Sequence, residues 1–113
     1  MHEYSIIQSL VDSVEAAVGA RANATVHAVE VSIGELAGVD CELLATAYDV
    51  FREGTLCEHA LLTIDRIPAR WECSRCGAAL ERGSRLRCTL CDEEPRLASG
   101  DEIILKRIEL EVA

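Results

Sequence analysis

The chain has 113 residues, a formal net charge of −9 and a hydrophobic fraction of 50%. This length fits one compact domain, or one domain that carries a small metal-stapled module. So acidic a surface repels phosphate backbones and favours cationic partners, either metal ions or a basic patch on another protein. No apolar run approaches the roughly 18 residues that a membrane span needs, so we expect no membrane-spanning segment.

The first two thirds of the chain predict a helix, a strand, a helix and a strand. Residues 4–19 carry apolar side chains at steps of three and four, which predicts a helix that Gly19 ends. Residues 25–34 alternate and are rich in β-branched side chains, which predicts a strand. Asp40 is a candidate N-cap for the second helix, and residues 60–68 predict a second strand. We expect the inward face of that second helix to be formed by Leu43, Leu44, Ala47, Val50 and Phe51.

A cysteine-rich segment, residues 69–98, separates the second strand from a third strand over residues 102–112. In the third strand we expect Ile104, Ile108, Leu110 and Val112 to lie mostly on one face. The cysteine-rich segment therefore interrupts two strands and is not appended to one end. The predicted fold is α+β: a small three-stranded sheet with two helices, plus an inserted four-cysteine, zinc-ribbon-like module. Residues 1–68 and 99–113 form the α/β domain, and residues 69–98 form the module.

Two CxxC pairs, separated by the eleven residues 77–87, dominate that segment; they consist of Cys73, Cys76, Cys88 and Cys91. This spacing is typical of a tetrahedral four-thiolate zinc site. Such a site has no open position for a substrate, so the zinc is expected to be structural. The alternative is a thiol–disulfide motif, which usually stands alone at the head of a helix. Because Met1-His2-Glu3 is not a basic leader, the pairs indicate reduced thiols and a cytoplasmic protein.

The residues that follow each CxxC pair differ. Gly77 after Cys76 suits a zinc knuckle, whereas Asp92 after Cys91 is less usual there. The remaining cysteines, Cys41 and Cys57, lie outside the pairs, and we expect both to be free thiols.

The second candidate metal site is the start of the chain. The donors there are the His2 imidazole and the amide nitrogens of His2 and Glu3, with the terminal amine and the Glu3 carboxylate as further candidates. Nearly planar, all-nitrogen donor sets favour Ni(II) or Cu(II) over zinc. This pattern is weak when taken alone, because a histidine at position two is usually an exposed surface residue. His27 and His59 have no ligand-like neighbours, and we expect them to be structural or to face solvent.

The cysteine-rich segment also carries six arginines: Arg70, Arg75, Arg82, Arg85, Arg87 and Arg96. They support a second hypothesis, a zinc-ribbon accessory protein that binds nucleic acid or a transcription or processing complex. Acidic residues nearly balance these arginines, and Trp71 is the one stacking aromatic nearby. A metal-dependent hydrolase needs an open metal site with a general base, which the sequence does not supply, so we expect no enzyme.

Taken together, the motifs resemble the HypA/HybF family, the nickel metallochaperones of NiFe-hydrogenase maturation. The resemblance covers the whole chain, through the Met1-His2-Glu3 start, residues 31–40, residues 47–50, the CxxC pairs and the tail from residue 99 to 110. It implies a nickel-binding α/β domain with a zinc module inserted before the last strand. It also implies that His2 binds nickel through its imidazole, together with backbone nitrogens of His2 and Glu3.

The same resemblance implies partners. Nickel would pass to or from a nickel-handling GTPase and onward to the hydrogenase large-subunit precursor, and in some members to urease accessory proteins. The chain departs from the family pattern in two respects. The eleven-residue spacer is short, and no histidine follows His59, so the module cannot supply an additional histidine to nickel.

Overall fold

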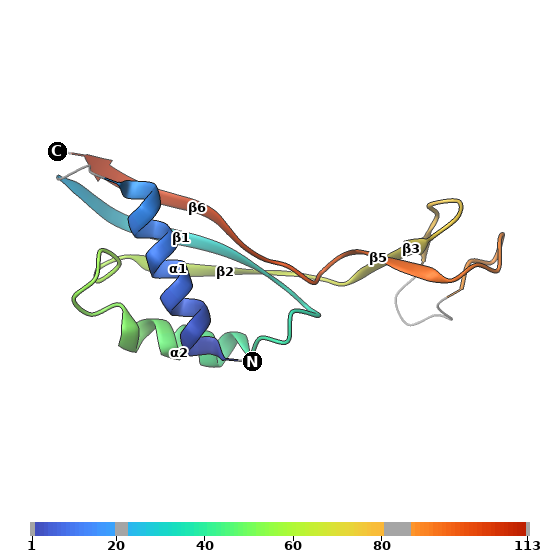
Figure 1. Ribbon diagram of the computed structural model, residues 1–113, viewed down its shortest axis with the longest axis horizontal. Coiled ribbons are helices and arrows are strands. Elements are labelled where there is room, and N and C mark those ends of the chain that lie inside the picture. Colours follow the sequence, from blue (N-terminus) through green and yellow to red (C-terminus); the bar gives the residue numbers. More distant parts are fainter. Residues whose placement is uncertain (1, 20–22, 81–86, 113) are drawn as a thin grey trace.

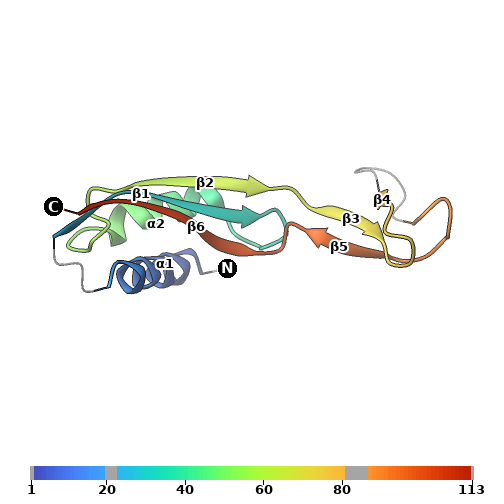
Figure 2. The same ribbon diagram turned by 90° about the horizontal axis from the view of Figure 1, so that it is seen from above.

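The computed structural model describes residues 2–19, 23–80 and 87–112. The order of the elements is α1 (Glu3–Val18), β1 (Ala24–Gly34), α2 (Cys41–Phe51), β2 (Leu61–Ile67), β3 (Arg70–Cys73), β4 (Ala79–Leu80), β5 (Pro95–Ser99) and β6 (Ile103–Val112). The molecule measures 57 × 25 × 16 Å, because its two small sheets lie end to end along the long axis (Figures 1 and 2). In the described part of the chain, neither helix is long and apolar enough to cross a membrane.

The first sheet has the strand order β2-β1-β6, with β1 parallel to β2 and antiparallel to β6. The apolar side chains that alternate along β1 meet the apolar faces of both helices in one core. Each of these buried aliphatic side chains contributes roughly 1.5–3 kcal/mol relative to exposure. This arrangement confirms the α+β fold class, with two helices, a small sheet and an inserted four-cysteine segment. The core consists of Ile7, Leu10, Val11, Val14, Val18, Val26, Val29, Val31, Ile33, Leu44, Tyr48, Cys57 and Ala60.

The face of α2 that points into the core differs from the predicted one. Leu44 and Tyr48 are buried, whereas Leu43 is 52% and Val50 is 63% exposed. At about 100° per residue, Leu43, Ala47 and Val50 form one stripe on the helix, and Leu44, Tyr48 and Phe51 form another about 100° away. The prediction assigned residues of both stripes to the buried face, and it was wrong for Leu43 and Val50. The reason is that the aromatic side chain of Tyr48 occupies the centre of the buried face.

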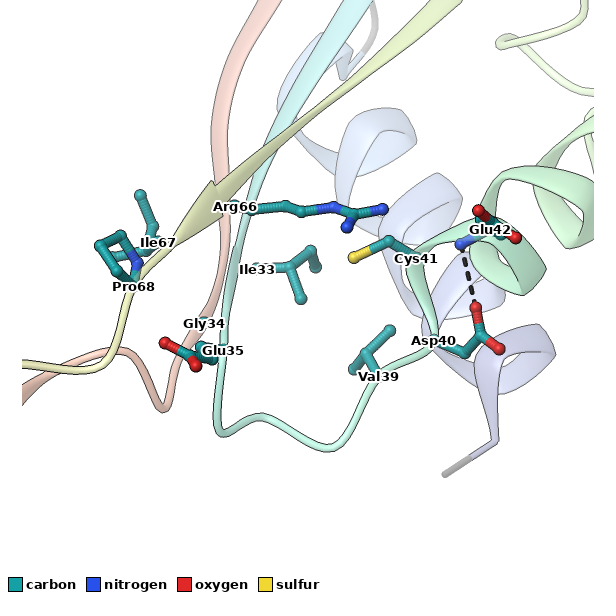
Figure 3. Close-up of a pocket in the computed structure, with 10 residues that line it drawn as sticks. All are labelled: Ile33, Gly34, Glu35, Val39, Asp40, Cys41, Glu42, Arg66, Ile67 and Pro68. Atoms are coloured by element: carbon teal, nitrogen blue, oxygen red, sulfur yellow. Dashed lines mark hydrogen bonds between the residues drawn. The ribbon is translucent and has the colours of Figure 1, made fainter. Parts of the chain in front are cut away.

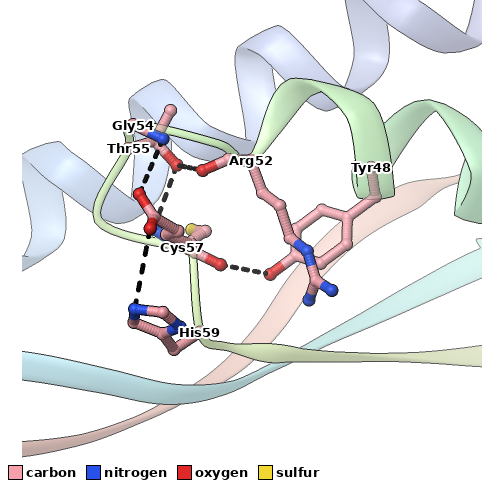
Figure 4. A network of polar contacts seen from close by, with 7 residues as sticks. Tyr48, Arg52, Gly54, Thr55, Cys57 and His59 are labelled. Carbon is pink, nitrogen blue, oxygen red and sulfur yellow. Dashed lines mark hydrogen bonds and ion pairs between the residues drawn. The ribbon is translucent and has the colours of Figure 1, made fainter.

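Tyr48 can occupy the core because its hydroxyl is satisfied there (Figure 4). The hydroxyl donates to the backbone oxygens of Ala60 at 2.8 Å and Cys57 at 3.3 Å. The Arg52 guanidinium also donates to the Ala60 oxygen, at 3.0 Å, which ties the loop after α2 to the helix. Burial raises the pKa of Tyr48 to about 12. His59 lies beside this network at the surface, as expected, 3.7 Å from the Glu58 carboxylate.

A β-bulge changes which side chains of β6 face the core. Glu30 pairs with Arg107 and Val31 pairs with Leu105, so Lys106 is the extra residue. An extra residue moves the side chains beyond it to the opposite face of the strand. Leu105, Ile108 and Leu110 therefore pack against the core, whereas Ile104 is 45% exposed. The expectation that Ile104 shares the face of Ile108 was wrong for this reason.

The second sheet, β4-β3-β5, is antiparallel and is inserted between β2 and β6. The chain enters the second sheet through Pro68 and Ala69 and leaves it through Gly100 (Figure 2). Both connecting segments contact the end of β1 at a narrow junction. We call this junction the neck, and it is formed by residues 34–36, 67–69 and 100. A Cβ on Gly34 would lie 2.3 Å from the Gly100 carbonyl, so the two backbones touch directly.

Hydrogen bonds close the neck. The Glu35 backbone N–H donates to the Ile67 oxygen at 2.8 Å, and the Leu36 N–H donates to the Gly100 oxygen at 2.7 Å. The Glu35 carboxylate accepts from the Ala69 N–H at 2.8 Å. The second sheet is therefore attached to the first through backbone contacts on both of its connecting segments.

Candidate metal sites

The four paired cysteines converge at the end of the second sheet. Their sulfur atoms lie within 4.8 Å of one another, and the Cys76 and Cys88 sulfurs are 3.7 Å apart. Zn–S bonds of about 2.3 Å place the sulfurs of a tetrahedral site about 3.8 Å apart. The four-cysteine cluster thus has the dimensions of a closed, four-coordinate metal site.

The first CxxC pair forms a tight turn around its own sulfur. The backbone N–H groups of Arg75 and Cys76 each donate to the Cys73 sulfur at 3.4 Å. Gly77 closes the turn by donating to the Cys73 oxygen at 3.0 Å, with a φ of +75°. A glycine suits this position because positive φ costs it little.

The second pair forms the corresponding turn with an aspartate in place of the glycine. Asp92 donates from its N–H to the Cys88 oxygen at 2.8 Å and has a φ of +52°. Aspartate is one of the few side chains that visit this region. The Arg87 guanidinium donates to the Asp92 carboxylate at 3.0 Å and to its backbone oxygen at 2.6 Å. Asp92, the residue that is unusual at this position, therefore completes the second zinc knuckle.

The thiols of this cluster are unequal in acidity. Hydrogen bonding from the Cys76 backbone N–H lowers the pKa of Cys73 to about 7. Cys91 behaves in the opposite way. A hydrogen bond between the Cys91 and Cys76 side chains, together with burial, raises the pKa of Cys91 to about 12. Neighbouring thiolates repel one another, so at least one thiol of the cluster stays protonated unless a cation compensates the negative charge. A divalent ion bound by thiolates supplies that compensation and displaces the protons.

The second candidate site lies at the start of α1, beside α2 and away from the four-cysteine cluster (Figure 1). His2 is the exposed N-cap residue of α1, and within the described residues its side chain makes no capping hydrogen bond. Glu3 is only 7% exposed, and its carboxylate accepts from the Asp40 backbone N–H at 3.0 Å. This bond holds the pKa of the Glu3 carboxyl below its ordinary value. Met1 lies outside the described residues.

A pocket that the sequence did not indicate lies between the C-terminal end of β2 and the start of α2 (Figure 3). It has a volume of about 530 Å³, and the side chains of Arg66 and Cys41 point into it. At its rim, the Asp40 carboxylate caps α2 by accepting from the backbone N–H groups of Glu42 and Leu43 at 3.1 and 3.2 Å. The pocket depends on the path of the loop between β1 and α2, for which the sequence holds no periodic pattern.

The comparisons with known proteins now identify the family. A family model described as "Hydrogenase/urease nickel incorporation, metallochaperone, hypA" matches residues 1–110. The chain belongs to the HypA family. The hydrogenase maturation factor HypA of Nitrosospira multiformis is 38% identical over 112 residues, which cover 97% of each chain. HypA of Aquifex aeolicus is 37% identical over 114 residues, which cover 99% of each chain.

Solved HypA structures share the fold. The solution structure of the Ni metallochaperone HypA from Helicobacter pylori superposes with a TM-score of 0.72 at 29% identity and full coverage of both chains. A second HypA solution structure gives a TM-score of 0.79 at 27% identity, over 100% of this chain and 98% of the other. The similarity to HypA thus includes the helices, both sheets and the inserted four-cysteine segment.

Proposed function

We propose that this chain is a nickel metallochaperone that binds Ni(II) at its N-terminus and delivers it for NiFe-hydrogenase maturation with a partner GTPase. The observation that carries the proposal is the exposed His2 at the start of α1, in a member of a family described by nickel incorporation. On this proposal the chain is a carrier and not an enzyme, and nickel is its cargo.

The position of His2 and Glu3 on α1 supports a nitrogen donor set. The first N–H groups of an α-helix have no carbonyl partner within the helix. Loss of the amide protons of His2 and Glu3 to nickel therefore breaks no intrahelical bond. The positive end of the helix dipole also favours the resulting negative charge. The exposed His2 imidazole supplies a further nitrogen, and such donor sets favour Ni(II) or Cu(II).

Glu3 has two separable groups in this proposal. Its amide nitrogen is a nickel ligand, while its carboxylate holds the Asp40 N–H. A carboxylate engaged in the fold is a poor candidate for a ligand that must exchange. Nickel is then held by few groups at the end of the chain, which suits a metal that has to be released.

We further propose that Cys73, Cys76, Cys88 and Cys91 hold one structural Zn(II). The sulfur spacing and the two knuckles support this assignment. Residues 69–98 are then a zinc-binding module, inserted in a nickel-binding domain formed by residues 1–68 and 99–113. A cytoplasmic location agrees with six cysteines of which none is joined in a disulfide.

The proposed partners are the nickel-handling GTPase and the hydrogenase large-subunit precursor, with urease accessory proteins as a further client. The nucleic-acid hypothesis is less favoured, because three of the six arginines that would contact phosphate lie beside acidic side chains. Arg87 pairs with Asp92, Arg75 lies 3.8 Å from a Glu93 carboxylate oxygen, and Arg96 donates to Glu72 at 2.6 Å. Arg82 and Arg85 lie outside the described residues.

Nickel titration of three forms tests the proposal: the native chain, His2→Ala, and a form with one residue added before Met1. Zinc content is measured in each form by elemental analysis. We expect about one zinc per chain in all three and tight nickel binding in the native form alone. Undiminished nickel affinity in both altered forms would overturn the N-terminal site.

A further inference from the structure

The outer surface of α2 exposes a run of apolar side chains beside the start of α1. The exposed Leu43 and Val50 and the half-buried Ala47 line one stripe of the helix, and Tyr4 of α1, which is 53% exposed, stands next to them. Together these four residues are called the docking strip. They border a hollow of about 480 Å³ whose lining also includes His2. The docking strip is thus an unpartnered apolar surface in contact with the proposed nickel site.

The two helices that form this surface carry acidic charge, and Glu42 and Asp49 are exposed on α2 itself. Within the described helices, every charged side chain is a carboxylate, and they are Glu3, Asp12, Glu15, Glu42 and Asp49. Arg52, which directly follows α2, donates to the Ala60 oxygen and lies 3.6 Å from the Asp49 carboxylate, and its side chain is only 29% exposed. The helical layer therefore presents an apolar surface among side chains whose net charge is negative.

We propose that the docking strip binds an amphipathic helix of a partner protein, whose aliphatic face is bordered by lysine or arginine. Contacts at i, i+4 and i+7, as provided by Leu43, Ala47 and Val50, are the spacing at which helices recognise one another. The stripe is about 10 Å long, which matches two turns of a partner helix. A second copy of this chain is a poor occupant, because it would bring two acidic surfaces of like charge together.

This inference rests on the proposed function, and it names where the partner GTPase docks. A GTPase bound on the strip holds its own nickel ligands close to His2. Metal exchange then occurs between ligands of one complex, at an effective concentration far above that of free nickel. The docking strip and the nickel site thus act together in transfer, while only His2 and its neighbouring amides hold the metal.

The test uses the purified cognate hydrogenase-maturation GTPase as the probe, in calorimetric titrations of the full-length chain. The variants are Leu43→Asp and Val50→Asp, with Leu61→Asp as the matched control because Leu61 is 72% exposed on β2, away from the strip. We expect the first two to weaken GTPase binding about tenfold or more, since buried apolar contacts dominate such interfaces. The control stays within about twofold of the native affinity on the same reasoning.

Two further measurements identify the occupant. Raising the salt concentration should slow association of the native pair, because an acidic surface attracts a basic partner. Light scattering of the chain alone should give a monomer. Self-association that Leu43→Asp abolishes would assign the strip to a second copy and overturn the proposal.

Nickel titration of the same proteins separates this inference from the proposed function. Equal GTPase binding by the native chain, Leu43→Asp and Val50→Asp overturns the docking strip, even where His2-dependent nickel binding is intact. An absence of GTPase binding to the native chain overturns it as well. A native chain that binds the GTPase through the strip but takes up no nickel supports the docking surface and contradicts the proposed function.

Discussion

The Glu3 carboxylate accepts a hydrogen bond of 3.0 Å from the backbone N–H of Asp40, which lies 37 residues later in the chain. Asp40 is in turn the N-cap of α2. One hydrogen bond therefore joins the starts of the two helices, and it places the proposed nickel ligands against the loop that leads back to the neck.

Substitution of Glu3 separates its structural role from nickel binding. Glu3→Gln keeps an oxygen that accepts from Asp40, so we expect a thermal midpoint near that of the native chain and unchanged nickel stoichiometry. Glu3→Ala removes the acceptor and lowers the midpoint. Calorimetry and nickel titration measure the two properties. Loss of nickel in Glu3→Gln at an unchanged midpoint would show that the carboxylate itself binds the metal.

Substitution of Asp92 tests whether the turn after Cys91 requires a residue with a positive φ. Because its φ is +52°, we expect Asp92→Gly to retain one zinc per chain, whereas Asp92→Val is strained. Left-handed backbone costs a side chain about 1–2 kcal/mol, so the valine should weaken zinc binding roughly five- to thirtyfold. Competition with a chromophoric chelator measures the affinity. Equal zinc affinities of the glycine and valine forms would contradict the observed turn.

Substitution of Gly34 tests how closely the backbones of Gly34 and Gly100 approach each other in the neck. Its Cβ would lie 2.3 Å from the Gly100 carbonyl, so Gly34→Ala forces two backbones apart and should cost about 1–3 kcal/mol or more of unfolding free energy. Gly38→Ala is the control, because nothing lies within 4 Å of its added Cβ and the cost comes from positive φ alone. Urea denaturation measures both. A smaller loss for Gly34→Ala than for Gly38→Ala would mean that the neck opens readily.

Ionisation of Tyr48 is expected to lower the stability of the folded chain at alkaline pH. Burial raises its pKa to about 12 in the folded chain, against about 10 in an unfolded one. The fold prefers the protonated phenol, so this contribution is complete below about pH 10 and is lost as the pH rises toward 12. We expect the unfolding free energy of the native chain to fall across that window.

Tyr48→Phe removes this titration. It should cost about 1 kcal/mol at neutral pH, because the hydroxyl's hydrogen bonds are lost. The cost stays small because the Cys57 oxygen keeps the bond from the Ala60 N–H and the Ala60 oxygen keeps the bond from Arg52. Its unfolding free energy should then fall less than that of the native chain between about pH 10 and 12. Parallel curves for the two proteins would mean that another group limits alkaline stability.

The parts of the fold that sequence reasoning found are those with local patterns. The CxxC spacing determines the sulfur cluster over a few residues, and Asp40 caps α2 through bonds to its immediate neighbours. The orientation of α2 was beyond such patterns, because two apolar stripes compete and the position of Tyr48 depends on Ala60 in another segment. The bulge at Lys106 likewise depends on pairing between distant strands.

The Glu3 carboxylate shows the same limit at the candidate nickel site. Its residue type and position made it a possible ligand, and the partner that engages it lies in a loop distant in sequence. The sequence pattern holds no information about that contact.

The end-to-end arrangement of the two sheets has a consequence for how this chain behaves in solution. Its radius of gyration is 18.1 Å, whereas a compact chain of this length has about 13 Å. A monomer of 12.3 kDa should therefore elute from a gel-filtration column as a compact protein of roughly twice its mass or more. An apparent dimer on such a column is the expected behaviour of one elongated molecule, and the mass has to come from light scattering or sedimentation equilibrium.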